Sequence, residues 1–165
     1  MSRPRGSKRS GQHGPLRYRA RTMRFAICSD EPYPVNETVA RELERSGHSV
    51  VRFGSLQSGT ETPWAEATQK AAEAVANGAC DEGVFFCWTG TGASIAANKV
   101  RGIRAALCTD AQTAQGARIW NHANVLVLSN RLTSDDHAKE ILAVWLETPR
   151  DDPRGQAGVA ALRDR

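Results

Sequence analysis

The sequence predicts an α/β fold in which an open, doubly wound parallel sheet of five strands has helices on both faces, a three-layer αβα sandwich. Two observations predict this fold. Apolar runs of strand length alternate with helical segments throughout residues 23–148, and the connections between them are short. The run Gly83–Cys87 contains large and β-branched apolar residues without alternation, which is typical of a strand covered on both faces.

Five strands are expected, one for each apolar run. They cover Arg24–Cys28, Ser49–Phe53, Gly83–Cys87, Gly102–Leu107 and Asn124–Leu128. In sheets of this kind, ligands bind beyond the carboxyl ends of the strands. Asp30 follows the first strand, Cys87 ends the third and Arg131 follows the fifth. These three side chains are therefore expected to line one crevice.

Glycines and prolines delimit the expected helices. Gly47 is placed to end the first helix, and Pro63 is placed to begin the second, after a polar loop at residues 54–62. The last long helix begins at a cap, Ser134 or Asp135. The expected helices cover Val35–Ser46, Trp64–Asn77, Ile95–Lys99, Ala111–Trp120 and the cap to Glu147, with a short helical stretch at Gln156–Arg163.

The charge of the chain is unevenly distributed. The formal net charge is +4, but residues 1–22 hold seven basic and no acidic residues, which leaves the remainder at −3 (+4 minus +7). We expect residues 1–22 to be a disordered basic extension and residues 23–148 to be one α/β domain. The extension is either a solvated tail or a segment that contacts RNA or an anionic surface. A nucleic-acid partner is not expected, because such tails need no partner and the body is mildly acidic.

The sequence gives no sign of a membrane segment or a metal site. No apolar run is long enough to span a membrane, and no secretory signal is present. The four cysteines lack the spacing of metal ligands. We therefore expect reduced thiols, a cytoplasmic location, and no membrane partner.

A glycine-rich loop follows the third strand and leads into a helix. The loop reads Thr89-Gly90-Thr91-Gly92-Ala93-Ser94, and Cys87 stands at its entrance. A strand, a glycine-rich turn and a helix together point backbone N–H groups at an anion. Taken alone, Cys87 would be interpreted as a small apolar residue at a strand end. Beside this loop, it suggests proton transfer as well as binding.

Two segments closely resemble one enzyme family. Residues 87–105 match the pattern CxTGxGxSIAANKxxGIRA, and residues 117–126 match ARxxNxANVL, with Arg131 shortly afterwards. Both segments resemble the type B ribose-5-phosphate isomerase family, which includes the galactose-6-phosphate isomerase subunits. The order and spacing of the elements match from Met23 to about Val159, nearly the whole folded part.

The resemblance implies an activity and an assembly. It implies a Rossmann-like fold that performs aldose–ketose isomerisation through an enediolate, without a metal or another cofactor, on a sugar or sugar phosphate. It also implies a homodimer, or a tetramer, whose active sites are shared between subunits. The tail, residues 149–165, is then expected to pack on the partner subunit.

The resemblance also implies roles for individual residues. Cys87 would be the base that moves a proton between C1 and C2, with Thr89 and the loop amides holding the enediolate charge. Asn121 would be donated across the dimer, and Asp30 would contact sugar hydroxyls. Arg131 and Arg154 would bind the phosphate. The other residues expected around the substrate are Glu31, Trp64, Gly90, Thr91, Gly92, Ala93, Ser94, Trp120 and His122.

Several positions depart from the family pattern. Glu31 and Trp120 stand where the family has histidines, and Gly158 stands in place of a second arginine. In the family these histidines open the furanose ring and help to hold phosphate, work that suits imidazole. A carboxylate at position 31 would repel a phosphate dianion. The substrate is therefore expected to be shifted from ribose 5-phosphate.

Some interpretations stay open on the sequence. His122, two positions from a replaced histidine, either partly replaces it or is a polar loop residue. Trp64, Trp88 and Trp120 either form an aromatic wall of the pocket or are packing residues. The alternative function is a non-catalytic sugar- or phosphate-binding paralogue, or the silent subunit of a heteromeric isomerase, because the ring-opening histidine is missing.

Overall fold

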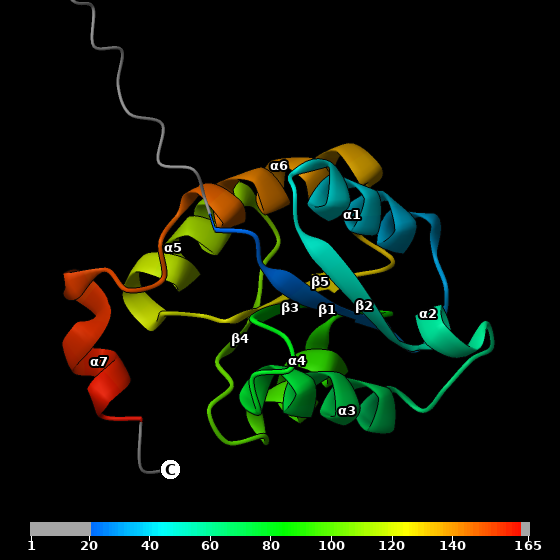
Figure 1. Cartoon of the computed structure of the whole chain (residues 1–165), viewed down its shortest axis with the longest axis horizontal. Helices are drawn as coiled ribbons and strands as arrows, with labels where there is room; N and C mark the ends of the chain where they lie inside the picture. Colours follow the sequence, from blue (N-terminus) through cyan, green and yellow to red (C-terminus); the bar gives the residue numbers. More distant parts are fainter. Residues whose placement is uncertain (1–20, 163–165) are drawn as a thin grey trace, which may run out of the picture.

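The structure is a computed structural model that describes residues 21–162. The disorder predicted for residues 1–22 therefore concerns a segment that lies largely outside the described residues. The sheet has five parallel strands in the order β2-β1-β3-β5-β4 (Figure 1). The strands are β1 (Arg24–Ser29), β2 (Ser49–Gly54), β3 (Glu82–Cys87), β4 (Ala105–Leu107) and β5 (Val125–Ser129).

Helices cover both faces of the sheet, so the predicted αβα sandwich is confirmed. One face carries α1 (Pro34–Arg45), α5 (Ala111–Asn121) and α6 (Asp135–Glu147), and the other carries α3 (Trp64–Ala76) and α4 (Thr91–Asn98) (Figure 1). The short elements are α2 (Ser55–Ser58), the 3₁₀ turn η1 (Pro153–Gly155) and α7 (Gln156–Ala160). No helix within residues 21–162 is long and apolar enough to cross a membrane.

Two hydrophobic cores lie on the two faces of the sheet. In β3, Val84 and Phe86 pack towards α1, α5 and α6, whereas Phe85 and Cys87 pack towards α3 and α4. All four residues are buried. The continuous apolar run of β3 thus reflects burial on both faces, as expected for a central parallel strand.

The structure differs from the predicted elements in several places. Helix α4 begins at Thr91 rather than at Ile95, so most of the predicted glycine-rich loop forms its first turn. β4 begins at Ala105 rather than at Gly102, because Arg104 donates its N–H to Asn124 Oδ1 (2.8 Å) and Gly102 turns the chain with φ 86°. Residues 54–62, predicted as a loop, contain α2. The polar residue that begins α2, Ser55, is buried because its hydroxyl donates to Ser29 O (2.9 Å).

Candidate active site

Cys87 ends β3, directly opposite Ser129 at the end of β5. The side chain is 5% exposed and packs among small residues of the α3 and α4 face, including Cys28 and Ala93. Ala93 donates its N–H to Cys87 Sγ over 3.5 Å. The thiol therefore lies at the carboxyl edge of the sheet, as predicted, and in contact with the amino end of a helix.

Helix α4 presents its first amides next to this thiol. Its N-cap, Gly90, has φ 78°, and a Cβ there would lie 2.5 Å from Leu107 Cδ1, so only glycine fits. The first backbone bond of the helix runs from Ser94 N–H to Gly90 O (3.0 Å). The amides of Thr91 and Gly92 have no partner within a helix that starts here. The arrangement can hold a developing negative charge.

The two threonines of the loop interact with one another. Thr89 Oγ1 lies 2.7 Å from Thr91 Oγ1, and both side chains are exposed. A hydroxyl pair of this kind can donate to one oxygen and accept from another. Thr89 is therefore available to a substrate beside the amides of α4.

One buried asparagine ties the ends of three strands together. Asn130 donates from Nδ2 to Ser29 Oγ (3.0 Å) and from its N–H to Cys87 O (3.0 Å). Its Oδ1 accepts from Asn36 Nδ2 in α1 (2.9 Å). Asn130 was not predicted as a site residue. Its position directly after a strand is the sequence feature that could have pointed to it. Its contacts hold the segments that carry Asp30, Cys87 and Arg131 together at the carboxyl edge of the sheet, where the crevice was expected.

The loop after β1 carries the acidic side of the crevice. Asp30 is partly buried, and its Oδ1 accepts the Glu31 N–H (3.0 Å). Burial raises the pKa of Asp30, and the carboxylates of Glu31 and Glu61 raise it further against that hydrogen bond, which lowers it. Glu31 Oε2 accepts from the hydroxyl of Tyr33 (2.9 Å). Glu31 is thus held in place rather than free to swing into solvent.

Aromatic rings and one arginine border the same crevice. Tyr33 and Trp88 have ring centroids 5.9 Å apart, and the Arg131 guanidinium lies 6.0 Å from the Trp88 ring. Trp64 covers the loop, because a Cβ on Gly92 would lie 3.0 Å from its ring. Trp64 and Trp88 are both about half exposed. Two of the three tryptophans considered for an aromatic wall therefore border the crevice.

The remaining predicted residues lie at the opposite edge of the sheet within one chain. Trp120, Asn121 and His122 end α5, just before β5 begins. The central strands β3 and β5 are six and five residues long, which separates the two edges by about 17 Å. Arg154 lies with this group, because its guanidinium is 5.4 Å from the Trp120 ring. A single chain does not bring these four residues to Cys87.

His122 and Arg154 are also engaged locally. His122 is a buried residue of the turn after α5, with φ 48°, and its Nε2 lies 2.8 Å from Asp152 O. Arg154 donates two side-chain hydrogen bonds (2.8 and 2.9 Å) and one backbone hydrogen bond (2.9 Å) to Asp152, and these lower the pKa of Asp152 to about 2. The expected convergence of Arg131 and Arg154 does not occur within one chain.

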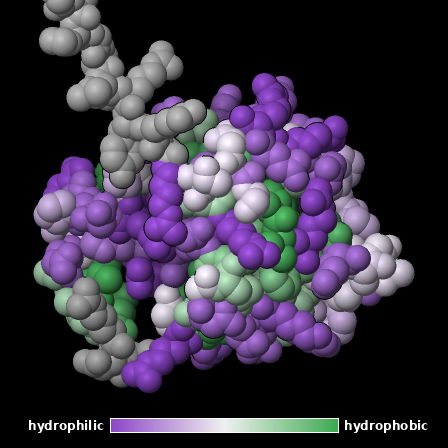
Figure 2. Space-filling model, viewed as in Figure 1, coloured by the Kyte–Doolittle hydropathy of each residue, from purple (hydrophilic) through white to green (hydrophobic). Residues whose placement is uncertain are grey.

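Two cavities accompany these groups. The larger, of about 1150 Å³, separates the loop between α4 and β4 from α7, where Figure 2 shows an opening in the surface. Asn121 lines it, together with Arg104 and the apolar side chains of Val159 and Leu162. The smaller, of about 190 Å³, lies at the end of β2. Neither reaches Cys87, so one chain does not enclose the crevice.

Within residues 21–162 no group of three His, Cys, Asp or Glu residues could hold a metal ion.

Comparison with known proteins identifies the family. A family model described as Ribose/Galactose Isomerase matches residues 25–162. The chain belongs to this family. It is 39% identical over 127 residues to ribose-5-phosphate isomerase B of Escherichia coli, covering 77% of this chain and 84% of that protein. It is 35% identical over 113 residues to D-erythrulose-4-phosphate isomerase of Pectobacterium atrosepticum, covering 68% and 74%.

A solved structure confirms the same relationship in three dimensions. The ribose-5-phosphate isomerase B of Clostridium thermocellum superposes with a TM-score of 0.80 at 37% identity, covering 86% of this chain and 96% of that one. The family and the fold expected from the glycine-rich loop are therefore confirmed. The chain is an aldose–ketose isomerase by membership of this family.

Proposed function

We propose that this protein interconverts an aldose and a ketose that carry a terminal anionic group, with Cys87 as the base. The observation that carries the proposal is the contact between Cys87 Sγ and the Ala93 N–H at the start of α4. A thiol acts as a base only as its anion, and the amino end of a helix favours a negative sulfur. The amides of Thr91 and Gly92, at the same end of α4, would hydrogen-bond the oxyanion of the enediolate.

The proton moves between neighbouring carbons in two balanced steps. Cys87 as thiolate takes the proton from C2 of the open-chain aldose, and the electron pair passes to the carbonyl oxygen as the enediolate forms. The thiol then returns the proton to C1, while a proton shifts between the two oxygens, and the ketose results. In this proposal Thr89 and the amides of Thr91 and Gly92 hold the oxygens, and Asp30 binds a hydroxyl of the sugar.

The replaced histidines favour a four-carbon substrate. Glu31 and Trp120 offer no imidazole for opening a furanose ring. A four-carbon aldose 4-phosphate needs no ring opening, because the oxygen that would close its ring carries the phosphate. A relative that acts on D-erythrulose 4-phosphate supports this choice. We therefore infer that a four-carbon sugar 4-phosphate is preferred over ribose 5-phosphate.

A second copy of the chain would complete the site. Asn121 and Arg154 lie at the edge of the sheet opposite Cys87 and next to an open cavity. A twofold dimer would bring this edge of one copy to the crevice of the other, where Arg131 and Arg154 of different copies would share the anionic group. Residues 149–162 carry Arg154 and α7, so in this proposal they pack on the second copy.

Turnover of defined substrates tests this proposal. Purified protein is incubated with D-erythrulose 4-phosphate or with ribose 5-phosphate, and the aldose-to-ketose ratio is followed by proton NMR. We expect a higher kcat/KM for the four-carbon substrate. Turnover of ribose 5-phosphate alone would contradict the substrate assignment, and turnover of neither by the purified protein would contradict a homomeric enzyme that acts on these substrates.

The replaced histidines also support a second candidate, a subunit that works only with a related chain. Glu31 and Trp120 would then be complemented by histidines of that chain. Co-purification from the native host tests this candidate, with the pure protein as the control. A second isomerase-like chain that is required for turnover would favour it over the homodimer.

A further inference from the structure

We propose that Arg118 is a positioning residue for the part of the active site that each chain gives to the other copy. The inference rests on the shared site of the proposed function. Arg118 contacts neither Cys87 nor any other residue at the carboxyl edge of the sheet. Its bonds all lie at the opposite edge, around the segments that carry Asn121 and Arg154.

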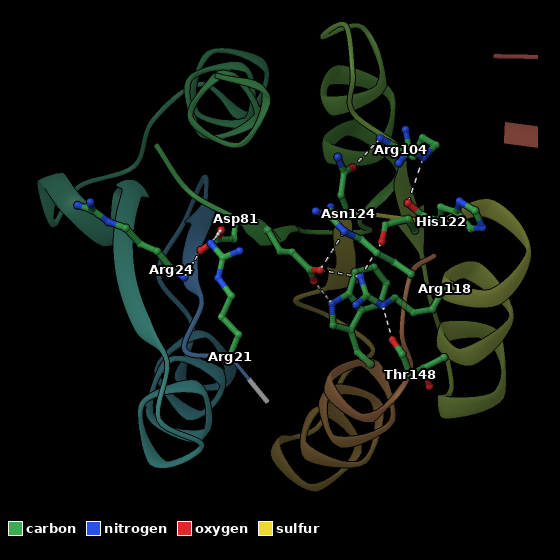
Figure 3. A network of polar contacts seen from close by, with 12 residues as sticks. Arg21, Arg24, Asp81, Arg104, Arg118, His122, Asn124 and Thr148 are labelled. Carbon is green, nitrogen blue, oxygen red and sulfur yellow. Dashed lines mark hydrogen bonds and ion pairs between the residues drawn. The ribbon is translucent and has the colours of Figure 1, made fainter. Parts of the chain in front are cut away.

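The guanidinium of Arg118 is fixed by three hydrogen bonds in the interior (Figure 3). Nη1 donates to Glu82 Oε1 (2.8 Å) and to Ala123 O (2.9 Å), and Nε donates to Thr148 O (2.9 Å). Arg118 is 4% exposed and Glu82 is 2% exposed. A planar guanidinium reaches these acceptors from two nitrogens of a rigid fork, whereas an ammonium has its three donors on one nitrogen.

The Glu82 carboxylate, which binds Arg118, has further partners of its own. Glu82 Oε2 accepts from Trp145 Nε1 in α6 (2.8 Å), and the Arg118 guanidinium lies 4.7 Å from the Trp145 ring. Arg150 Nε lies 3.6 Å from Glu82 Oε1. Nε and Nη1 of Arg118 and both carboxylate oxygens of Glu82 therefore have defined partners, which fix the orientation of the guanidinium.

The two carbonyls bound by Arg118 belong to the two segments that the second copy would need. Ala123 directly follows the turn that ends α5, and Arg104 Nε donates to the Asn121 and His122 carbonyls of that turn (3.1 and 3.0 Å). Thr148 precedes the segment that leads to Arg154. The segments also touch, because a Cβ on Gly155 would lie 2.5 Å from Ile119 O. Arg118 thus sets the turn and the tail relative to each other and to the sheet.

The Arg118–Glu82 pair lies far from Cys87 of the same chain. Glu82 begins β3 and Cys87 ends it, and the two side chains point to opposite faces of the sheet. Five strand residues span about 17 Å. A change at Arg118 should therefore affect the crevice of the other copy and not the crevice of its own chain.

The variant Arg118→Lys retains the charge opposite Glu82 but loses the fork that reaches Ala123 O and Thr148 O. A displacement of about 1 Å in a substrate-positioning group lowers the rate by about 100-fold. We expect kcat/KM of the Arg118→Lys homodimer to fall about 10- to 100-fold. The matched control is Arg52→Lys, at an exposed ion pair with Glu37 (2.9 Å), and it should leave kcat/KM unchanged.

Mixed dimers distinguish this role from a general loss of structure. Two chains with different affinity tags are co-expressed, and the heterodimers are purified by both tags. A Cys87→Ala chain with an Asn121→Ala chain is the benchmark, because one of its two sites is intact, and it should recover about half of wild-type activity. Arg118→Lys with Cys87→Ala should recover as much. Arg118→Lys with Asn121→Ala should stay as low as the Arg118→Lys homodimer.

The outcomes separate the two proposals. If the benchmark heterodimer is inactive, the shared site of the proposed function is wrong. If the benchmark is active but Arg118→Lys recovers with both partners, with neither, or only with Asn121→Ala, the positioning role is wrong. Should Arg118→Lys not fold, Glu82→Gln takes its place, because it removes the charge that holds Arg118 while keeping an acceptor for Trp145. The same pattern of recovery is expected from it.

Discussion

Removing the Arg118 guanidinium should cost the fold far more than removing an exposed one. In Arg118→Met the side-chain stem is kept, but the Glu82 carboxylate is left in the interior with Trp145 Nε1 as its close donor. The carbonyls of Ala123 and Thr148 lose their donor as well. Breaking one partner of a buried ion pair costs about 3–5 kcal/mol.

Because Arg150 lies near Glu82, we expect a loss of stability at the lower end of that range. Its side chain is 40% exposed and lies 3.6 Å from Glu82 Oε1, so it can compensate part of the unpaired charge. We expect a loss of about 3 kcal/mol in the free energy of unfolding for Arg118→Met. For a chain of this size that corresponds to a fall in Tm of about 6–12 °C.

Urea unfolding at one fixed protein concentration measures this loss, because the stability of an oligomer depends on concentration. The midpoint should fall while the slope m stays unchanged. The control Arg52→Met removes an exposed ion pair and should cost less than about 1 kcal/mol. A loss of less than 1 kcal/mol for Arg118→Met would refute the reasoning that this network holds the amino edge of the sheet together.

Three further changes have defined outcomes. Gly90→Ala should lower the free energy of unfolding, measured in urea, by about 2–4 kcal/mol, because the new Cβ contacts Leu107 and the residue has a positive φ. The control Gly158→Ala has open space around its Cβ and should cost little, so equal losses would contradict this prediction. Asp30→Asn should be more stable than wild type at neutral pH, because burial raises the folded pKa of Asp30, and the gain should vanish as the pH falls below the ordinary value of 3.8; a loss at neutral pH would contradict the sign. Arg131→Met should raise the inhibition constant of inorganic phosphate at least 10-fold, since a charged hydrogen bond is worth about 1.5–3 kcal/mol; unchanged inhibition would exclude Arg131 from the anion site.

The carboxyl edge of the sheet could be predicted from the sequence because local patterns determine it. The apolar run of β3 gives a central strand, and the glycines after it give a helix that starts beside Cys87. Parallel strands then place Asp30, Cys87 and Arg131 at one edge. Each step uses residues that are neighbours in the chain, or a rule of topology that holds for the whole fold class.

The contacts at the amino edge could not be predicted in the same way. Glu82 reads as the polar residue before a strand, and its partner Arg118 lies 36 positions later in a helix. His48 is a second example: it is largely buried, its Nδ1 accepts the Met23 N–H (3.1 Å) and its ring packs on Phe25. The contacts of Glu82 depend on how α5 and α6 pack on the sheet, and no local sequence pattern specifies that packing.

The resemblance predicted that Asn121 would come from the second copy of the chain, but it assigned Trp120, His122 and Arg154 to neither copy. Asn121 and Arg154 lie about a strand length from Cys87, although all three were expected around one substrate. Sequence order alone gives the residues of a site as one set. The structure divides that set between two edges of the sheet, and this division supports the shared site that the resemblance implies.

Hydrogen exchange at the substrate carbons tests the role of Cys87 most directly. The protein is incubated with D-erythrulose 4-phosphate in deuterated water, and deuterium at C1 of the ketose and C2 of the aldose is followed by proton NMR. We predict that wild type incorporates deuterium and that Cys87→Ser, which keeps the size of the side chain, incorporates it about 100- to 10,000-fold more slowly. Incorporation by folded Cys87→Ser at the wild-type rate would contradict the account.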